Sequence, residues 1–410
     1  MSLDVIIVGA GAAGLMAGAR SAQRGLKTLV LEKNKKLGVK ILMSGGTRCN
    51  ITHHTDAHGI VQAFGRNGSF LHSALAALSP ERVVELMHEI GVPTKVEVTG
   101  KVFPVSDRAI DVRDALVRYA EQSGCQISPA EPVTAILRTD DGFEISTATR
   151  ELSCRRLILT TGGKSYPGCG TTGEGFIWAQ QLGHSIIPPR PALTPILTGD
   201  QWMHELSGLT LENVELSVFD SKVAKRPLDR RRGSFLFTHF GLSGPVALDI
   251  SGSITACANP TELILRANFL PNVSMEAFRQ QLNELSRVDG KRHVIGVLTE
   301  HLPKSLARAL AQAASIADEL PMAELSRAKL DCLIELLYRC PLNITGTKGF
   351  DKAEVTAGGI SLSEVDSRTM QSKLVPGLFL AGEILDLDGA IGGFNFQSAF
   401  STGWLAGENV

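Results

Sequence analysis

Three glycines near the amino terminus have the spacing of a dinucleotide site. Gly9, Gly11 and Gly14 follow the apolar run Val5–Val8, and Glu32 ends the next apolar run. In such a GxGxxG turn, the first glycine makes the tight turn, the second lets backbone approach a pyrophosphate, and the third packs helix against strand. The helix N-terminus favours the negative charge of the pyrophosphate. An acid in the position of Glu32 accepts hydrogen bonds from a ribose diol, which favours FAD or NAD over NADP.

A second polar segment, Lys40–Asn50, lies where the chain leaves the second predicted strand. Its consecutive small residues let backbone N–H groups converge on a flat or anionic group. Arg48 offers paired donors to pyrophosphate oxygens, and Asn50 offers both a donor and an acceptor. Cys49 is a candidate for covalent flavin attachment or thiol redox chemistry. Because no second cysteine accompanies it in the sequence, a structural role is favoured.

Later glycine pairs indicate which dinucleotide binds. The predicted strand Arg156–Leu159 leads to Gly162 and Gly163, and ligands of open α/β sheets collect at the carboxyl ends of strands. Near the carboxyl terminus, an acid after a strand can bind ribityl hydroxyls. The helix that begins near Asn395 can direct backbone N–H groups at the pyrimidine carbonyls of a flavin, where negative charge develops on reduction. This returning strand–turn–helix is typical of a flavin site, so we predict FAD.

Two further groups of residues are candidates for chemistry. Tyr166 follows the Gly162–Gly163 pair, and its phenol could give a proton to substrate; packing alone is the competing explanation. His54 and His58 have the i,i+4 spacing of a metal clamp. With no cysteine ligands or helix signature nearby, a solvated loop is favoured and we predict no metal site.

Composition limits the classes of function. The chain has 410 residues, 41 Lys plus Arg, 42 Asp plus Glu and a net charge of -1. We therefore expect neither a nucleic-acid partner nor a membrane surface, and the dense basic cluster Lys225–Arg232 is interpreted as a solvated hairpin flank. The seven cysteines are scattered and lack a CxxC, which favours reduced thiols and a cytoplasmic location. The oligomeric state is not predicted.

The order of elements predicts a discontinuous domain. Strand and helix signals alternate through the first 185 residues or so, until successive prolines at Pro188 and Pro189 break the pattern. We predict an α/β, Rossmann-like FAD-binding domain from 1–190 and 346–410, with an insertion at 191–345. Within the insertion, 191–270 is predicted to be β-rich and 271–345 helical.

Five motifs in order resemble the HI0933-like bacterial flavoproteins, a family similar to bile-acid 3-dehydro-Δ4-reductases and aminoacetone oxidases. The motifs are the GAGAAG start, Lys40 with SGGTRCN, TTGGKSYPGCGTTGEG, HFGLSGP and GEILDLDGAIGGFNFQSA. The resemblance implies a two-dinucleotide-binding-domain flavoprotein fold with an inserted β-barrel plus helical domain. It also implies a set of FAD contacts: Gly11, Ala13, Glu32, Ser44, Arg48, Asn50, Val133, Gly163, Gly382, Asp386, Asn395 and Gln397.

Together, the motifs and the resemblance predict a set of cofactor-binding residues. They are Gly9, Gly11, Ala12, Ala13, Gly14, Glu32, Lys33, Lys40, Ser44, Gly45, Gly46, Arg48, Cys49, Asn50, Val133, Thr161, Gly162, Gly163, Gly382, Glu383, Asp386, Gly392, Gly393, Asn395, Gln397 and Ala399.

We expect an FAD-dependent oxidoreductase that passes a hydride between a small organic substrate and the flavin. An NAD(P)H-dependent reductase is favoured, with NAD(P)H as a transient donor, although a second GxGxxG for it is missing. Two alternatives stay open: an oxidase of a small amine or amino ketone that uses oxygen, and a non-catalytic or tRNA-directed flavin-binding protein.

Overall fold

The computed structural model describes residues 3–222 and 226–410. The chain divides into two compact units, Met1–Ala192 with Phe350–Val410, and Leu193–Gly349. The second boundary lies four residues after the expected 345/346, because β17 (Ile344–Thr347) pairs with β11 (Ile196–Thr198) in the sheet of the second unit. The other boundary shifts from 190 to Ala192, where β10 ends.

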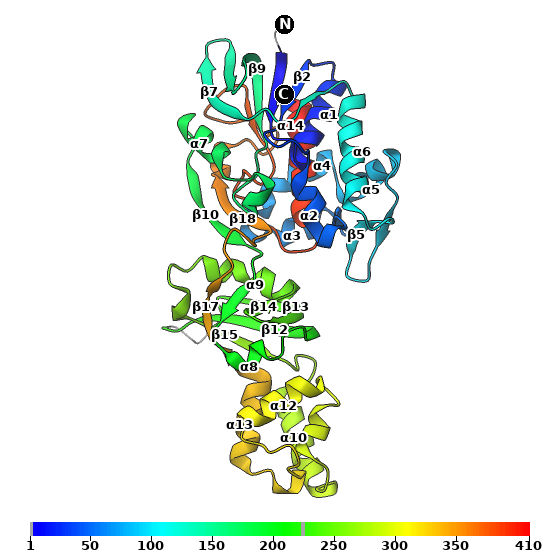
Figure 1. The fold of residues 1–410 in the computed structure, drawn as a ribbon, viewed down its shortest axis with the longest axis vertical. Coiled ribbons are helices and arrows are strands. Elements are labelled where there is room, and N and C mark those ends of the chain that lie inside the picture. Colours follow the sequence, from blue (N-terminus) through cyan, green and yellow to red (C-terminus); the bar gives the residue numbers. More distant parts are fainter. Residues whose placement is uncertain (1–2, 223–225) are drawn as a thin grey trace. The chain divides into compact units, whose positions relative to one another are not determined.

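Parallel strands form the centre of the first unit (Figure 1). They lie in the order β6 (Gln126–Ser128), β2 (Thr28–Leu31), β1 (Leu3–Val8), β9 (Glu151–Leu159) and β19 (Leu378–Leu380). The central strands β2 and β19 are short apolar runs that are buried throughout, and β1 is buried from Val5 to Val8, as strands covered on both faces must be. The carboxyl-terminal strand β19 therefore completes a sheet that the amino-terminal strand begins.

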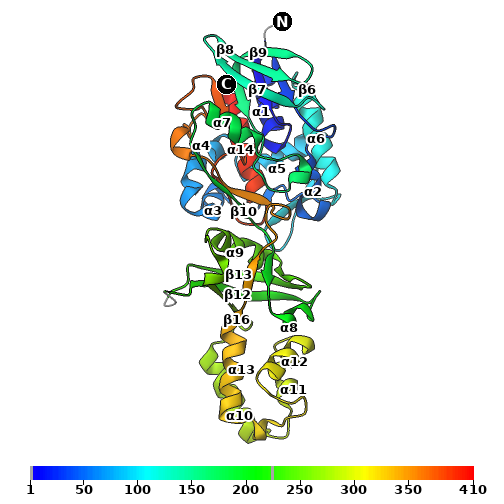
Figure 2. The same cartoon turned by 60° about the vertical axis from the view of Figure 1, so that its left-hand side comes forward.

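The remaining strands of this unit depart from simple alternation of strands and helices. An antiparallel meander joins β7 (Val133–Thr139) and β8 (Gly142–Thr147) to β9 (Figure 2). A small sheet has the order β3 (Thr52–His53), β5 (Lys101–Pro104), β4 (Thr94–Val96). The expectation of strand–helix alternation up to residue 185 is thus wrong for these segments.

The successive prolines at Pro188 and Pro189 were expected to interrupt the regular elements, and they do not. Pro188 and Pro189 lie inside β10 (Ile186–Ala192), which pairs antiparallel with β18 (Val355–Ile360). The register shifts between Ile187 and Arg190, so these two prolines sit in an irregular stretch of a two-stranded ribbon, where a missing N–H is tolerated.

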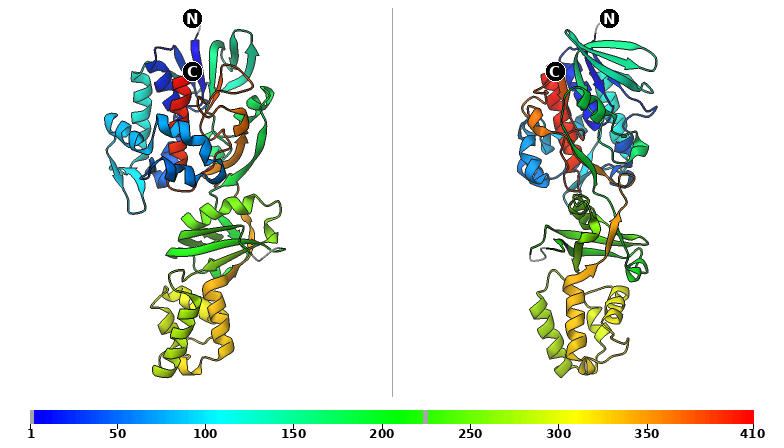
Figure 3. Two further views of the ribbon diagram at one scale, coloured as in Figure 1. Left: turned by 180° about the vertical axis from the view of Figure 1, so that it is seen from behind. Right: turned by 90° about the vertical axis from the view of Figure 1, so that its left-hand side faces the viewer.

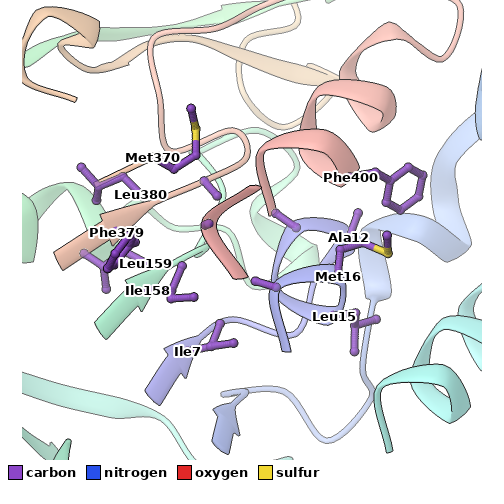
Figure 4. Packing of buried hydrophobic residues seen from close by; sticks show 14 of the residues in the cluster. Ile7, Ala12, Leu15, Met16, Ile158, Leu159, Met370, Phe379, Leu380 and Phe400 are labelled. Carbon is purple, nitrogen blue, oxygen red and sulfur yellow. The ribbon is translucent and has the colours of Figure 1, made fainter. Parts of the chain in front are cut away.

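Two long helices dominate the packing of the first unit. The helix α1 (Ala12–Gln23) lies against α14 (Phe394–Asn409), which Figure 3 shows from behind, and against α6 (Ala109–Gln122). Figure 4 shows Met16 of α1 and Phe400 of α14 within the same buried cluster as the strand residues of the sheet. The other helices of this unit are α2 (Val39–Thr47), α3 (Ala57–Ala63), η1 (Gly65–Leu71), α4 (His72–Ala77), α5 (Pro80–Glu89), η2 (Pro167–Cys169), α7 (Glu174–Gln181) and η5 (Leu362–Glu364).

The second unit contains an antiparallel sheet and a group of helices. In order across the sheet, the strands are β16 (Cys340–Leu342), β15 (Leu263–Asn268), β12 (Thr210–Asp220), β13 (Asp229–Thr238), β14 (Gly241–Ser243), β11 and β17. Only Asn343 separates the two end strands β16 and β17 along the chain. The sheet therefore curls toward a barrel-like layer. The helices are α8 (Gln201–His204), α9 (Pro245–Thr255), η3 (Pro260–Glu262), α10 (Met275–Val288), α11 (Val294–Leu298), α12 (Lys304–Ala313), η4 (Met322–Glu324) and α13 (Arg327–Arg339).

Within the described part of the chain, no helix combines the length and apolar character that crossing a membrane requires. The seven cysteines are all unpaired.

Candidate functional site

The three glycines of the first turn have different surroundings. Gly9 has a φ of +104°, and a Cβ there would lie 2.7 Å from the carbonyl oxygen of Thr160. A Cβ on Gly14 would lie 1.8 Å from the carbonyl oxygen of Gly9, so only glycine lets α1 pack this closely. A Cβ on Gly11 would meet nothing within 4 Å. Gly11 therefore faces open space at the N-terminus of α1, as backbone that approaches a pyrophosphate must.

The buried Glu32 carboxylate is fixed by backbone donors. Its Oε2 accepts from the Ala10 N–H at 2.9 Å and its Oε1 from the Asn34 N–H at 2.8 Å. The Glu32 carbonyl accepts from the Glu131 N–H at 2.9 Å, which brings the segment before Val133 beside it. Each carboxylate oxygen keeps a second lone pair for a ribose hydroxyl.

The polar segment Lys40–Asn50 begins as a helix that unwinds. Within α2, Ser44 leaves helical geometry with a ψ of 153°, and Gly45 and Gly46 are left-handed. Thr47 and Cys49 also have positive φ values, 70° and 64°. Non-glycine residues held in this region carry strain of about 1 to 3 kcal/mol each and cluster at functional sites.

Asn50 follows this loop and is buried. Among the residues that the structure describes, its Oδ1 is one of two buried side-chain oxygens or nitrogens without a hydrogen-bond partner. A Cβ on Gly393 would lie 2.8 Å from this oxygen, so it faces the N-terminus of α14. Leaving a buried acceptor unpaired is unfavourable, so the position fits a ligand that brings a donor.

Arg48 is engaged by acidic side chains of the protein. Its Nη1 lies 2.7 Å from Glu97 Oε1 and 3.4 Å from Asp107 Oδ1, and its guanidinium lies 3.9 Å from the centroid of Phe103. The hydrogen bond to Glu97 raises the pKa of Arg48. The pyrophosphate contact expected of Arg48 stays a prediction.

Cys49 is fully buried. Burial raises the pKa of its thiol to about 12. The thiolate is the reactive form of cysteine, so this environment favours the structural role over thiol redox chemistry.

Lys40 and Glu383 meet in a network that spans the two ends of the chain. The Lys40 ammonium pairs with Glu383 Oε2 and donates to Ser165 Oγ at 2.7 Å. Glu383 Oε1 accepts from Ser165 Oγ at 2.6 Å and from the Thr356 N–H at 2.9 Å. The sequence analysis missed Ser165 and Thr356. Ser165 could have been predicted because it is next to Tyr166, whereas no sequence pattern indicated Thr356.

A second contact between the chain ends lies at Gly382. It has a φ of +78°, its N–H donates to Thr402 Oγ1 at 3.0 Å, and a Cβ there would lie 2.9 Å from the Cβ of Ala13. The glycine after β19 is therefore close to the first turn of α1, which contains Ala12 and Ala13.

The turn before α14 depends on glycine and on Asn395. Gly392 and Gly393 have φ values of +131° and +96°, and a Cβ on Gly393 would lie 2.4 Å from the carbonyl oxygen of Thr52. The Asn395 side chain accepts from the Gly389 N–H at 2.8 Å and donates to its carbonyl at 2.9 Å. Asn395 thus fixes the loop before α14. Ala399 lies about one turn further along this helix.

Gln397 points into the protein. Its Oε1 accepts from Thr52 Oγ1 at 2.6 Å, and its Nε2 donates to the Leu78 carbonyl at 3.0 Å and to Ser401 Oγ at 2.9 Å. The side chain is fully buried. Its polar groups are therefore satisfied by protein partners.

Tyr166 lies in a strained position near the end of the first unit's main segment. It has a φ of 56°, and its N–H donates to the Phe350 carbonyl at 2.9 Å. The Lys352 ammonium lies 5.8 Å from the centroid of its ring. Tyr166 is half-buried.

The other predicted residues have structural partners. Lys33 donates to Thr172 Oγ1 at 2.9 Å and pairs with Glu174 at 2.6 Å. A Cβ on Gly163 would lie 2.3 Å from Thr356 Oγ1, so this glycine is required for packing. Gly162 is left-handed with a φ of 72° and, like Thr161, is only half-buried.

Two acids follow Gly382. Asp386 accepts from Asn67 Nδ2 at 3.3 Å, and the same amide bonds its carbonyl at 2.8 Å. Asp388, which the sequence analysis did not single out, has a pKa raised to about 6 by burial.

Residues 3–222 and 226–410 contain no cluster of three potential metal ligands among His, Cys, Asp and Glu. The ring of His58 instead bonds Gln62 at 2.8 Å.

The observed features fit FAD. Open backbone at Gly11, the Glu32 carboxylate and the unpartnered Asn50 oxygen lie on segments that contacts at Ala13, Gly382 and Gly393 bring together. An extended dinucleotide needs this combination of an open helix N-terminus, a ribose-binding acid and donors or acceptors for its ring.

Comparison with known proteins supports this assignment. The family model for the HI0933-like protein Rossmann domain matches residues 3–409. The chain is 33% identical over 410 residues to the ribosomal RNA dihydrouridine synthase of Escherichia coli, which covers 99% of this chain and 98% of that protein. It is 30% identical over 413 residues to the 3-dehydro-bile acid delta(4,6)-reductase of Clostridium scindens, with 98% and 97% covered.

Among solved structures, the open conformation of a flavocytochrome c3 fumarate reductase matches with a TM-score of 0.50 and 14% identity. The match covers 100% of this chain and 78% of that one. This likeness concerns the fold alone.

Proposed function

Because the chain belongs to the HI0933-like flavoprotein family, we propose that it is an FAD-dependent reductase of a carbon–carbon double bond conjugated to a carbonyl group. We further propose that its substrate is a uridine of ribosomal RNA and that NAD(P)H supplies the electrons. The observation that carries this proposal is the 33% identity to a ribosomal RNA dihydrouridine synthase along 99% of the chain. It replaces the small-molecule substrate that the net charge favoured.

The names of two relatives indicate the same type of reaction, the reduction of a conjugated carbon–carbon double bond. Dihydrouridine is uridine whose ring double bond, conjugated to a carbonyl, has gained two hydrogens. A 3-dehydro substrate with delta(4,6) double bonds is likewise a conjugated ketone. In the proposed reaction of uridine, a hydride adds to the β carbon and a proton to the α carbon, while NAD(P)H would be oxidised to NAD(P)⁺. Bound FAD supplies the hydride relay between NAD(P)H and substrate.

The protein's own groups hold the cofactor and supply the proton. Gly11 and Glu32 would hold the pyrophosphate and ribose, and Asn50 would accept a ligand donor. We assign the proton to the Tyr166 hydroxyl, since this residue is half-buried in a strained conformation. The Lys40–Glu383 pair, with Ser165, keeps the polar groups beside Tyr166 fixed.

The test is an anaerobic experiment in two steps. NADH or NADPH should bleach the flavin absorbance, and an unmodified ribosomal RNA transcript should restore it while one uridine gains the mass of two hydrogens. Tyr166→Phe should keep the bleaching rate and slow the RNA step by about 10²-fold or more, the range for loss of a general acid.

Other outcomes distinguish the alternatives. Restoration by a conjugated steroid ketone and not by RNA would assign the substrate class of the bile-acid relative. Bleaching by an amine under nitrogen, with restoration by oxygen, would indicate an oxidase. No bleaching by any reductant would exclude the catalytic assignment.

A further inference from the structure

One face of the second unit's sheet is unusually rich in arginine. Opposed residues of neighbouring strands share a face. Glu215 of β12 lies opposite Arg232 of β13, and Ser217 of β12 lies between Arg230 of β13 and Arg266 of β15. We name Arg230, Arg232 and Arg266 the arginine face.

Two of these arginines are held by partners that carry no charge. Arg232 donates from Nε to Asn213 Oδ1 at 2.7 Å and from Nη2 to Asn272 Oδ1. The Arg266 guanidinium lies 4.7 Å from the ring centroid of Phe219. Amides and an aromatic ring position a guanidinium without neutralising it.

The third arginine is only loosely paired. Arg230 Nε lies 3.6 Å from Glu215 Oε1, and 57% of its side chain is exposed. Three arginines thus face one carboxylate on this part of the sheet, although the whole chain has a net charge of -1.

The opposite face supplies a contrast. Arg231, between Arg230 and Arg232, lies 3.0 Å from Asp229 Oδ1, and Asp229 Oδ2 accepts from Ser253 of α9 at 2.8 Å. Its charge is compensated by a carboxylate that a helix fixes. The cluster expected to be a solvated hairpin flank therefore divides between two faces; its Lys225 lies outside the described residues.

We propose that the arginine face binds the phosphate backbone of the RNA substrate; this inference rests on the proposed function. Neighbouring strands lie about 4.8 Å apart and residues rise about 3.3 Å along a strand. Arg230 and Arg266, two strands apart, are therefore about 10 Å apart at the backbone, and Arg230 and Arg232 about 7 Å. The uncompensated, positioned guanidinium groups suit bidentate contacts with phosphates of successive nucleotides.

The test compares RNA binding by matched variants of the full-length protein loaded with FAD. The affinity for a fluorescent, unmodified ribosomal RNA transcript is measured by anisotropy at several salt concentrations. Each phosphate contact to a single strand contributes about 0.7 to the slope of log affinity against log salt. The triple variant Arg230→Gln, Arg232→Gln, Arg266→Gln should lose about 2 from this slope and bind at least about tenfold more weakly at low salt.

Arg231→Gln is the control, with an expected affinity within about twofold of wild type because its charge is already paired. Both variants should keep the wild-type rate of flavin bleaching by NAD(P)H, which shows that the fold and cofactor site are intact. If the triple variant does not fold, Arg230→Gln and Arg232→Gln alone should each lower the slope by about 0.7.

Two results would overturn the inference, and they differ in meaning. If wild type binds and reduces the RNA and the triple variant does so equally well, the arginine face is not the binding surface while the proposed function stands. If wild type neither binds nor reduces RNA, the assigned substrate and the arginine face fail together.

Discussion

Two loops of the first unit that contain glycines, Gly9–Gly14 and Ser44–Asn50, are both predicted to bring backbone close to the cofactor, but they use glycine for different reasons. In the first, a Cβ on Gly9 or Gly14 would lie within 2.7 Å of a carbonyl oxygen, so sterics dictate glycine. In the second, a Cβ on Gly45 would lie 2.9 Å from the Asn50 nitrogen, but a Cβ on Gly46 would meet nothing within 4 Å. The positive φ of this loop extends to the non-glycine residues Thr47 and Cys49.

The difference teaches where packing ends and function begins. Gly9 and Gly14 of the first loop are required by the fold before any ligand binds, whereas Gly11 is not. The strain in the second loop has no packing cause at the exposed Thr47, and strain of this kind accumulates where a surrounding structure holds backbone ready for a ligand.

The largest effect should follow Gly14→Ala. The new Cβ would lie 1.8 Å from the Gly9 carbonyl oxygen and 2.7 Å from Thr160 Oγ1, so backbone must move. We expect a loss of about 3 kcal/mol in the free energy of unfolding, the upper part of the usual range for overpacking, measured by chemical denaturation.

Gly252→Ala is the matched control, because this helical glycine of α9 has nothing within 4 Å of an added Cβ. It should stabilise the protein by up to about 1 kcal/mol, the helix propensity difference. Equal effects of the two variants would contradict the steric explanation.

Gly11→Val should separate fold from ligand within the same loop. Gly11 has a φ of -80° and a ψ of -169°, which any residue adopts, and its Cβ direction is open. The free energy of unfolding of the FAD-free protein, measured by thermal unfolding, should change by less than about 0.5 kcal/mol, as for a surface substitution. FAD affinity, measured by flavin fluorescence, should fall at least tenfold, since the side chain occupies the pyrophosphate's approach. Retained affinity would place the cofactor elsewhere.

The periodicity of apolar residues correctly predicted the buried strands and helices. The apolar runs before Gly9 and Glu32 became β1 and β2, and the insertion's alternating runs became β12, β13 and β15. Within the segment 271–345 that was predicted to be helical, apolar residues at helical spacing in Leu302–Ala314 and Leu325–Tyr338 correspond to α12 and α13. These segments are predictable because their burial sets their periodicity.

Partners distant in sequence were beyond prediction. The engagement of Arg48 by Glu97 and Asp107 depends on how β5 and its flanking turns fold back. Gln397 turns inward because Thr52 and Leu78 offer it bonds. Neither partner set has a sequence signature, since each joins segments that only the tertiary fold brings together.

The smallest effect tests the strain in the second loop directly. Thr47→Gly removes the strain of a left-handed β-branched residue, which should stabilise the folded protein by about 1 to 2 kcal/mol. The glycine also raises the conformational entropy of the unfolded chain, which should cost about 0.4 to 1 kcal/mol of stability. The net gain in stability should therefore be about 1 kcal/mol or less. Ser315→Gly is the control, because Ser315 is also exposed, has a φ of 56° and lies in the second unit. Both variants should shift the unfolding midpoint similarly, whereas only Thr47→Gly should speed FAD dissociation, because it loosens backbone that the strain holds in place. If FAD dissociates equally slowly from both, the positive φ at Thr47 is a local turn preference, and the contrast between the two loops is one of packing alone.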